Sequence, residues 1–161
     1  MAASVLQINI SPGGIPKLPI SVASLTSLGI VGDGHAHPQF HGGPNQALLL
    51  IASEAIAELA AAGFQVSNGA LGENITTSGM NCREWRTGQR WKIGREVVIE
   101  FTKIRVPCKT LNKLGRGIQS AVYDEVVKAN DPSSPCWGLG GFYAKVLTSG
   151  TFYPGDEIRP A

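Results

Sequence analysis

The sequence has few of the features that mark a disulfide framework, a metal cluster or a membrane protein. Its 161 residues include three cysteines, none of them in a C-x-x-C pair: Cys82, Cys108 and Cys136. Cysteines this far apart favour neither a disulfide framework nor a zinc or iron–sulfur site, so we expect reduced thiols. No stretch approaches the roughly 18–20 uninterrupted apolar residues of a membrane helix, and no basic residue precedes an apolar run at the N-terminus, which predicts a cytoplasmic protein.

Charged residues are also few, at 16% of the chain. Lys and Arg number 14 against 12 Asp and Glu, and no stretch interleaves several basic residues with aromatics, so we expect no nucleic-acid partner. Apolar residues make up 43% of the chain, without low-complexity tracts or charge runs. This composition is typical of a folded globular protein, and the length predicts a single domain over residues 1–161.

Glycine and proline, by contrast, are abundant, with 20 and 10 copies that divide the chain into short segments. The segments alternate or run apolar as strands do, which predicts strands at residues 5–10, 47–51 and 97–101, the last ended by Pro107. Strand–turn–strand units are expected at 20–34, 88–106 and 142–159. The pattern indicates a mainly β protein, an α+β mixed sheet or barrel with peripheral helices.

Two helices are expected at the periphery. The first follows Ser53, a plausible N-cap, and ends before Gly63, where a C′ glycine would stop it. The second is predicted near residues 118–129, where Ile118, Val122 and Val126 recur at helical spacing. The segment 130–141, rich in Pro, Ser and Gly, is interpreted as a flexible connection.

A glycine-rich segment at residues 32–46 holds all three histidines of the chain: His35, His37 and His41. Two imidazoles with a third histidine or Asp33 could bind zinc. Alternatively, the backbone N–H groups around Gly42 and Gly43 could bind an anion, with imidazole adding a hydrogen bond. A glycine turn that carries surface histidines is the third interpretation.

A second glycine-rich segment, residues 69–79, surrounds Glu73 and Asn74. A carboxylate beside an amide can recognise the donors and acceptors of a heterocycle, although an Asx turn or a structural cap explains the pattern nearly as well. The segment is not a P-loop, because no Lys-Ser or Lys-Thr follows its glycines.

Cys108 stands in "RVPCKTL", between Arg105 and Lys109. An isolated cysteine is often a small buried hydrophobe, but nearby cations favour the thiolate, which binds soft metals and attacks sulfur. Cys82 and Cys136 have weaker cationic surroundings in the sequence.

Taken together, three segments resemble the MOSC domain, the family named for the C-terminal domain of molybdenum cofactor sulfurases. They are "GDGHAHPQFHGGPNQALL", "GALGENITTSGMN" and "GQRWKIG…IEFTKIRVPCKTL", and the resemblance extends from about residue 13 to about residue 158. It implies a MOSC-type β-barrel-like fold, similar to the small stand-alone bacterial members. The PLP-dependent desulfurase domain of a full sulfurase would not fit in this chain.

The resemblance implies that Cys108 either ligates molybdenum of a bound molybdopterin cofactor or carries a persulfide. It also implies a set of cofactor-binding residues: His35, His41, Gly42, Gly43, Gly72, Glu73, Asn74, Arg105 and Lys109. The leading hypothesis is a molybdenum enzyme that reduces N-hydroxylated compounds with electrons from a separate reductase. A sulfur carrier served by a cysteine desulfurase, or a non-catalytic pterin-binding module, are the alternatives, and the oligomeric state stays open.

Overall fold

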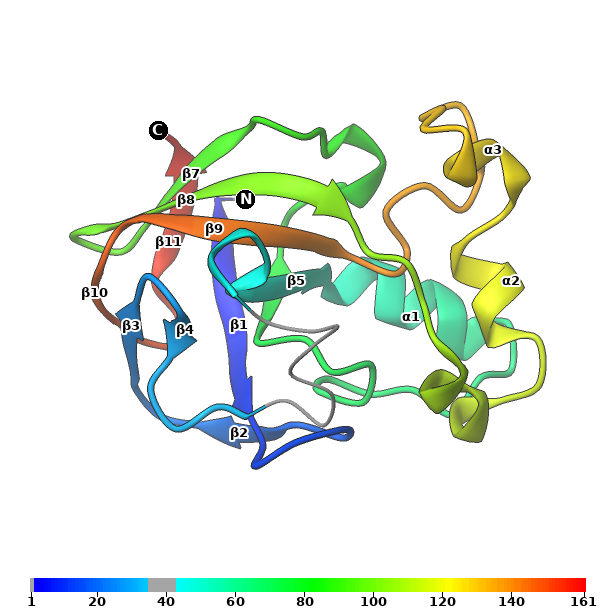
Figure 1. Ribbon diagram of the computed structural model, residues 1–161, viewed down its shortest axis with the longest axis horizontal. Helices are drawn as coiled ribbons and strands as arrows, with labels where there is room; N and C mark the ends of the chain where they lie inside the picture. The colour runs from blue at the N-terminus through cyan, green and yellow to red at the C-terminus, as the bar shows by residue number, and fades with distance from the viewer. Residues whose placement is uncertain (1, 35–42) are drawn as a thin grey trace.

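The computed structural model describes residues 2–34 and 43–161, and its main feature is a closed ring of seven strands (Figure 1). In order around the ring these are β1 (Ala3–Ile10), β6 (Ile75–Ser78), β5 (Leu48–Ala52), β9 (Phe142–Thr148), β8 (Val97–Ile104), β7 (Arg90–Ile93) and β11 (Glu157–Pro160). β11 pairs with β1 and closes the barrel. The predicted barrel, mainly β with few helices, is confirmed.

Four short strands complete the β structure. β2 (Leu18–Ile20) pairs with β1, while β3 (Ala23–Thr26), β4 (Gly29–Ile30) and β10 (Gly150–Phe152) form a separate three-stranded sheet. The helices α1 (Ser53–Ala61), α2 (Ile118–Val122) and α3 (Glu125–Lys128) lie at one side of the barrel, on the right in Figure 1. None of the helices in the described residues is long and apolar enough to span a membrane.

The strands follow from the distribution of apolar residues. Val97, Ile99 and Phe101 of β8 are fully buried while their neighbours are partly exposed, as alternation predicts. All five residues of β5 are buried, which fits a strand covered on both faces. Phe101 packs against Phe142 of β9 with ring centroids 5.2 Å apart, and these rings form the aromatic centre of the core.

The first predicted helix is present as α1 (Ser53–Ala61). It supplies the crossover between β5 and β6, which are parallel and therefore need one. Gly63 follows the helix at a φ of 100°, so the predicted C′ glycine is confirmed. Ser53, however, is the first helical residue rather than the N-cap, because Ala52 still has an extended backbone.

The second predicted helix is wrong as a continuous element. The chain forms α2 (Ile118–Val122) and α3 (Glu125–Lys128), separated by an extended Tyr123 and Asp124. The Asp124 carboxylate accepts a hydrogen bond of 2.8 Å from the Val127 backbone N–H and starts α3 anew. Val126 is therefore exposed instead of continuing the apolar stripe.

Segment 130–141 was expected to be a flexible connection, but it packs onto the core. Trp137 and Leu139 are buried, and the Trp137 indole Nε1–H donates a 2.9 Å hydrogen bond to the Trp85 carbonyl. Its Pro, Ser and Gly content suggested mobility, yet these two apolar side chains attach it to the barrel.

Candidate functional site

A β-bulge near the end of β8 determines which side chains reach the candidate site. Phe101 is opposite Ala144 in the pairing with β9, but Lys103, not Thr102, is opposite Tyr143. The extra residue reverses the alternation, so Lys103 lies on the same face of the sheet as Tyr143 rather than on the core face. Strict alternation from Phe101 would have turned Lys103 toward the core.

β8 continues into Arg105, whose contacts bring the "RVPC" segment to the "GALGEN" segment. The Arg105 backbone N–H donates to the Gly141 carbonyl at 3.0 Å, and its guanidinium Nη1 donates to the Leu71 carbonyl at 2.6 Å. The side chain is buried, with 6% of its surface exposed. Burial lowers the pKa of Arg105, with opposing effects from Tyr143, Glu73 and Cys108, but an arginine guanidinium keeps its proton in proteins.

Cys108 lies three residues further on, immediately before the 3₁₀ turn η3 (Lys109–Leu114). It is partly exposed, and its Sγ lies 2.7 Å from Thr110 Oγ1 in a hydrogen bond that either group can donate. A thiolate at Cys108 would accept this bond from the threonine hydroxyl.

The other two cysteines are in the core. Cys82 is 4% exposed, and burial raises the pKa of its thiol to about 11. Cys136 is 8% exposed and lies 3.3 Å from the Ser134 hydroxyl. Cys108 is thus the most accessible of the three thiols, as a ligand or nucleophile must be.

Lys109, expected beside the thiol, is exposed and makes neither a hydrogen bond nor an ion pair with a described residue. Its role toward a ligand stays a prediction. The sequence analysis did not select Tyr143, whose hydroxyl is affected by negative charge on Cys108 and by the positive charge of Arg105. Burial raises the pKa of Tyr143, so its hydroxyl is a proton donor at neutral pH.

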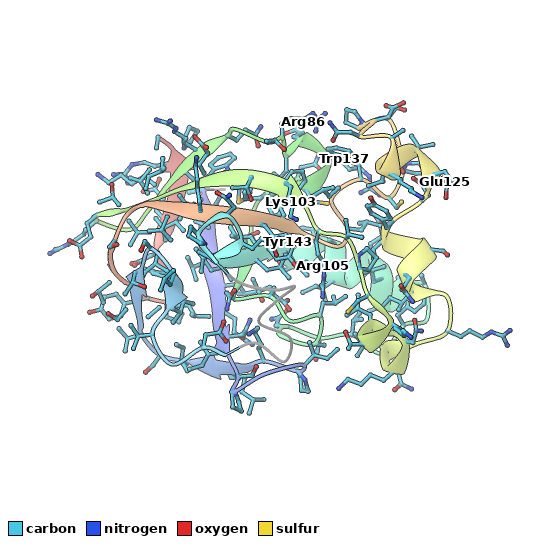
Figure 2. The ribbon with its side chains drawn as sticks, in the orientation of Figure 1. Arg86, Lys103, Arg105, Glu125, Trp137 and Tyr143 are labelled. Atoms are coloured by element: carbon cyan, nitrogen blue, oxygen red, sulfur yellow. The ribbon has the colours of Figure 1, made fainter. Side chains whose placement is uncertain are left out.

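Lys103 was also missed by the sequence analysis. Its Nζ lies 5.8 Å from the centre of the Tyr143 ring, a cation–π arrangement, and Figure 2 shows Lys103, Tyr143 and Arg105 near one another beside β8 and β9. No local pattern could have found the pair, because it forms across two strands and depends on the bulge.

Gly72 allows the close packing of the "GALGEN" turn against Arg105. Its φ is 89°, and a Cβ at this position would lie 2.9 Å from Ile15 Cγ2 and 4.0 Å from Arg105 Nη2. The positive φ and the contact with Ile15 both require glycine. The predicted site residue Gly72 therefore lies next to the guanidinium of the predicted site residue Arg105.

Glu73 is fully buried and only partly satisfied. Its Oε2 accepts a 3.2 Å hydrogen bond from the Thr76 hydroxyl, whereas Oε1 has no partner among the described residues. Burial raises the pKa of Glu73 to about 7, against the lowering effects of the Gly69 backbone, Thr76 and the charge of Arg105. Near neutral pH this carboxyl is therefore a mixture of protonated and charged forms.

Asn74 has a different set of contacts. Its Oδ1 accepts from the Leu49 backbone N–H at 3.1 Å, and its Nδ2 donates to the Asn9 carbonyl at 3.3 Å and to Asp33 Oδ2 at 2.8 Å. Both amide hydrogens are used within the protein. A direct contact between Asn74 and a cofactor stays a prediction, and the amide already has a structural role.

The histidine segment falls largely outside the described residues, including the predicted site residues His35, His41 and Gly42. At its start, Asp33 forms a buried ion pair of 2.6 Å with Lys17. At its end, Gly43 has a φ of 83° and precedes the 3₁₀ turn η1 (Pro44–Gln46). Asp33, considered above as a zinc ligand, is thus already paired, and the described residues contain no group of three His, Cys, Asp or Glu that could hold a metal.

The chemistry of these side chains fits a polar, anionic ligand with a soft metal. The Arg105 guanidinium makes one hydrogen bond to a described residue, and its other N–H groups are of the kind that bind anionic groups. The unpaired Glu73 Oε1 could receive a donor from a heterocycle, and the accessible sulfur of Cys108 suits a soft metal ion.

Comparison with known proteins decides the family. The MOSC domain family matches residues 37–159, well over half of the chain. The chain belongs to the MOSC domain family. This family is linked to binding of the molybdenum cofactor.

One related sequence is similar to this chain, and two solved structures have a similar fold. The uncharacterised protein YflK of Bacillus subtilis is 31% identical over 150 residues, which are 91% of this chain and 62% of YflK. The chain thus spans less than two thirds of that relative. The crystal structure of YiiM from Geobacillus stearothermophilus superposes with a TM-score of 0.71 at 20% identity, covering 99% of this chain and 75% of YiiM. The YUAD protein of Bacillus subtilis superposes with a TM-score of 0.69 at 20% identity, covering 98% of this chain and 94% of YUAD.

Proposed function

We propose that this MOSC protein binds the molybdenum cofactor through the thiolate of Cys108 and reduces N-hydroxylated compounds. The observation that carries the proposal is the position of Cys108: a partly exposed thiol in the charge environment of a buried arginine and a buried tyrosine, while the other two cysteines are in the core. Membership of a family linked to this cofactor supports the same assignment.

Each neighbouring residue has a defined task in this proposal. Cys108 Sγ holds the metal, and the Thr110 hydroxyl donates to that sulfur. Arg105 binds the anionic groups of the cofactor with the guanidinium hydrogens that Leu71 leaves available. Glu73, with its unpaired Oε1, accepts a hydrogen bond from the heterocycle when charged and donates one when protonated.

The reaction consumes two electrons and two protons, and it converts an N-hydroxyl compound into the amine and water. The bound molybdenum centre supplies the two-electron chemistry. The Tyr143 hydroxyl, protonated at neutral pH, can donate one proton to the departing oxygen. The electrons come from a separate reductase, since the three widely spaced cysteines cannot hold an iron–sulfur cluster.

Molybdenum content measured by elemental mass spectrometry tests this proposal, on protein expressed in a host that makes the cofactor. Wild type should carry near-stoichiometric metal, and Cys108→Ser should lose at least nine tenths of it, because a hydroxyl is a poor ligand for a soft metal. Cys136→Ser is the matched control and should retain metal.

Other outcomes separate the alternatives. Metal in wild type without turnover of any N-hydroxylated compound, with a chemical reductant supplied, would favour a non-catalytic cofactor-binding module. Absence of metal from wild type and variant alike, with a persulfide on Cys108 detected by mass spectrometry, would overturn the proposal in favour of a sulfur carrier that works with a cysteine desulfurase. Equal metal loss at Cys108 and Cys136 would contradict a special role for Cys108.

A further inference from the structure

An open pocket lies against β8 and β9, and its lining includes Lys103 as well as Phe101 of the aromatic core. Its lining includes Asn45 and Gln46 of η1, Glu100, Thr102 and Lys103 of β8, and Lys145 of β9. Glu100 is opposite Lys145 in the strand register, and Lys103 is opposite Tyr143. The pocket is therefore continuous with the stretch of β8 and β9 that leads to Arg105.

The charged groups of the pocket leave a positive excess. Glu100 is shared between two cations, with Oε1 2.8 Å from Arg90 Nε and Oε2 3.1 Å from Lys145 Nζ. These contacts lower the pKa of Glu100, so it stays charged and occupied. Lys103 forms no ion pair with any carboxylate of the described residues, and its ammonium group is exposed.

The remaining lining residues are hydrogen-bonding groups of the kind that bind phosphate oxygens. Asn45 and Gln46 have side-chain amides, and Thr87 has an exposed hydroxyl. Thr102 holds η1 in place, because its hydroxyl donates a 2.6 Å hydrogen bond to the Asn45 carbonyl. A phosphate monoester, with up to two negative charges and three acceptor oxygens, complements a site with one unpaired ammonium and several amide donors.

The position of Lys103 connects this pocket to the Cys108 site. Its Nζ lies 5.8 Å from the centre of the Tyr143 ring, and Tyr143 lies in the charge environment of Arg105 and Cys108. Figure 2 shows Lys103, Tyr143 and Arg105 near one another. A molecule anchored at Lys103 would therefore have the Tyr143 side chain between its anchor and Cys108, the residue proposed to hold the metal.

We propose that the pocket lined by Lys103, Lys145, Gln46 and Thr102 binds a phosphate monoester on the substrate, with Lys103 as the principal cation. The substrates would then be N-hydroxylated compounds with a phosphate group at the far end, of which nucleoside monophosphates are the simplest class. The N-hydroxyl group of these substrates rests on the proposed function, whereas phosphate binding at Lys103 does not depend on that function.

Binding to the protein without its cofactor tests the pocket by itself. AMP should bind with a measurable Kd by isothermal titration calorimetry, and adenosine should bind at least tenfold more weakly. Lys103→Met should weaken AMP binding at least tenfold while Lys92→Met leaves it unchanged, because Lys92 belongs to the neighbouring strand β7 and does not line the pocket. Equal affinity for AMP and adenosine, or an unchanged Kd in Lys103→Met, would overturn the inference.

Binding of inorganic phosphate distinguishes a site for free phosphate from a site for the phosphate group of a larger substrate. If it binds as tightly as AMP, the pocket is a site for free phosphate, and the assignment to a substrate is wrong. Weaker binding of inorganic phosphate than of AMP supports a site in which the rest of the nucleotide also contacts the protein.

Kinetics on the cofactor-loaded protein test the role in catalysis. An N-hydroxylated nucleoside 5′-monophosphate should have a kcat/KM at least tenfold higher than its nucleoside, and Lys103→Met should remove this preference through KM with little change in kcat. Turnover without a preference for the phosphate would overturn the inference and leave the proposed function intact. AMP binding that depends on Lys103, in a protein that turns over neither compound, would overturn the proposed function and leave the phosphate site intact.

Discussion

Two buried polar regions meet at the turn that contains Glu73 and Asn74, and they differ in how completely their groups are paired. On one side, Asn74 and the Lys17–Asp33 ion pair satisfy one another and the nearby backbone. On the other side, Glu73 keeps an unpaired carboxylate oxygen, and Arg105 uses only one guanidinium hydrogen bond to a described residue. Adjacent residues of one motif thus serve different purposes.

The comparison shows how to distinguish buried polar groups that support the fold from those that can bind a ligand. A buried group with all its partners in the protein contributes to shape, since any missing partner would cost about 1–3 kcal/mol. A buried group without one of its hydrogen-bond partners destabilises the free protein by this amount, and a ligand that supplies the missing partner removes the destabilisation. The region of Asn74, Asp33 and Lys17 belongs to the first kind, and Glu73 with Arg105 to the second.

The largest expected effect comes from a substitution in the region of Asn74, Asp33 and Lys17, where the buried polar groups are fully paired. Asp33→Ala should lower the free energy of unfolding by about 3–5 kcal/mol, because it leaves the ammonium of Lys17 buried without a counter-charge. The double variant Lys17→Met/Asp33→Ala should regain part of this loss. Urea unfolding of the three proteins measures both, and a loss below about 1 kcal/mol in Asp33→Ala would show that the ion pair does not support the fold.

A smaller effect comes from the incompletely paired region and depends on pH. The pKa of Glu73 is raised from 4.5 to about 7 in the folded protein, so the folded state binds more protons than the unfolded state between these values. Stability from this group is therefore greatest below about pH 4.5, falls as pH rises, and is fully lost above about pH 7, a difference of about 3 kcal/mol.

Glu73→Gln should remove this pH dependence, because glutamine does not titrate. Unfolding of wild type and variant should be compared at pH 5 and pH 8, with Glu125→Gln as the control at an exposed carboxylate. If wild type and Glu73→Gln lose stability equally between the two pH values, the buried carboxyl is not the cause.

The smallest expected effects on stability distinguish the buried Cys82 from the partly exposed Cys108. Cys82→Ser should cost about 1–2 kcal/mol of unfolding free energy, because it places a hydroxyl in an apolar environment. Cys108→Ser should stay within about 0.5 kcal/mol of wild type, as is usual for partly exposed positions. Thermal unfolding of the two variants decides the matter, and a larger loss at Cys108 would give this thiol a structural role.

Much of the barrel could be predicted because its strands obey local rules. The apolar run at residues 47–51, the alternation at residues 97–101 and the glycine after α1 each carry their own signal, and all three are confirmed. The break between α2 and α3 was missed. The periodic apolar pattern continues through Asp124, but this residue acts as an N-cap and starts a new helix. Capping and packing, rather than periodicity, decide which of the two structures forms.

The candidate site was less accessible to sequence reasoning. The segments that contain Glu73 and Arg105 were selected by resemblance as parts of one pocket, and the structure brings the two segments together. Lys103 and Tyr143 could not have been selected, because a β-bulge near Thr102 decides their pairing. The structural role of Asn74 was also hidden, since its partners lie 25, 41 and 65 residues away in the sequence.

The closure of the barrel has a consequence for how the chain folds. The ring is complete only when β1 meets β11, where Ala3 is paired with Ile158. Pairing segments so far apart in sequence requires the loss of chain entropy before the contact contributes, which places such barrels among slow folders, on the order of milliseconds to seconds. We expect the β1–β11 seam to form late for this reason, and until it does both strands expose an edge on which another chain could pair.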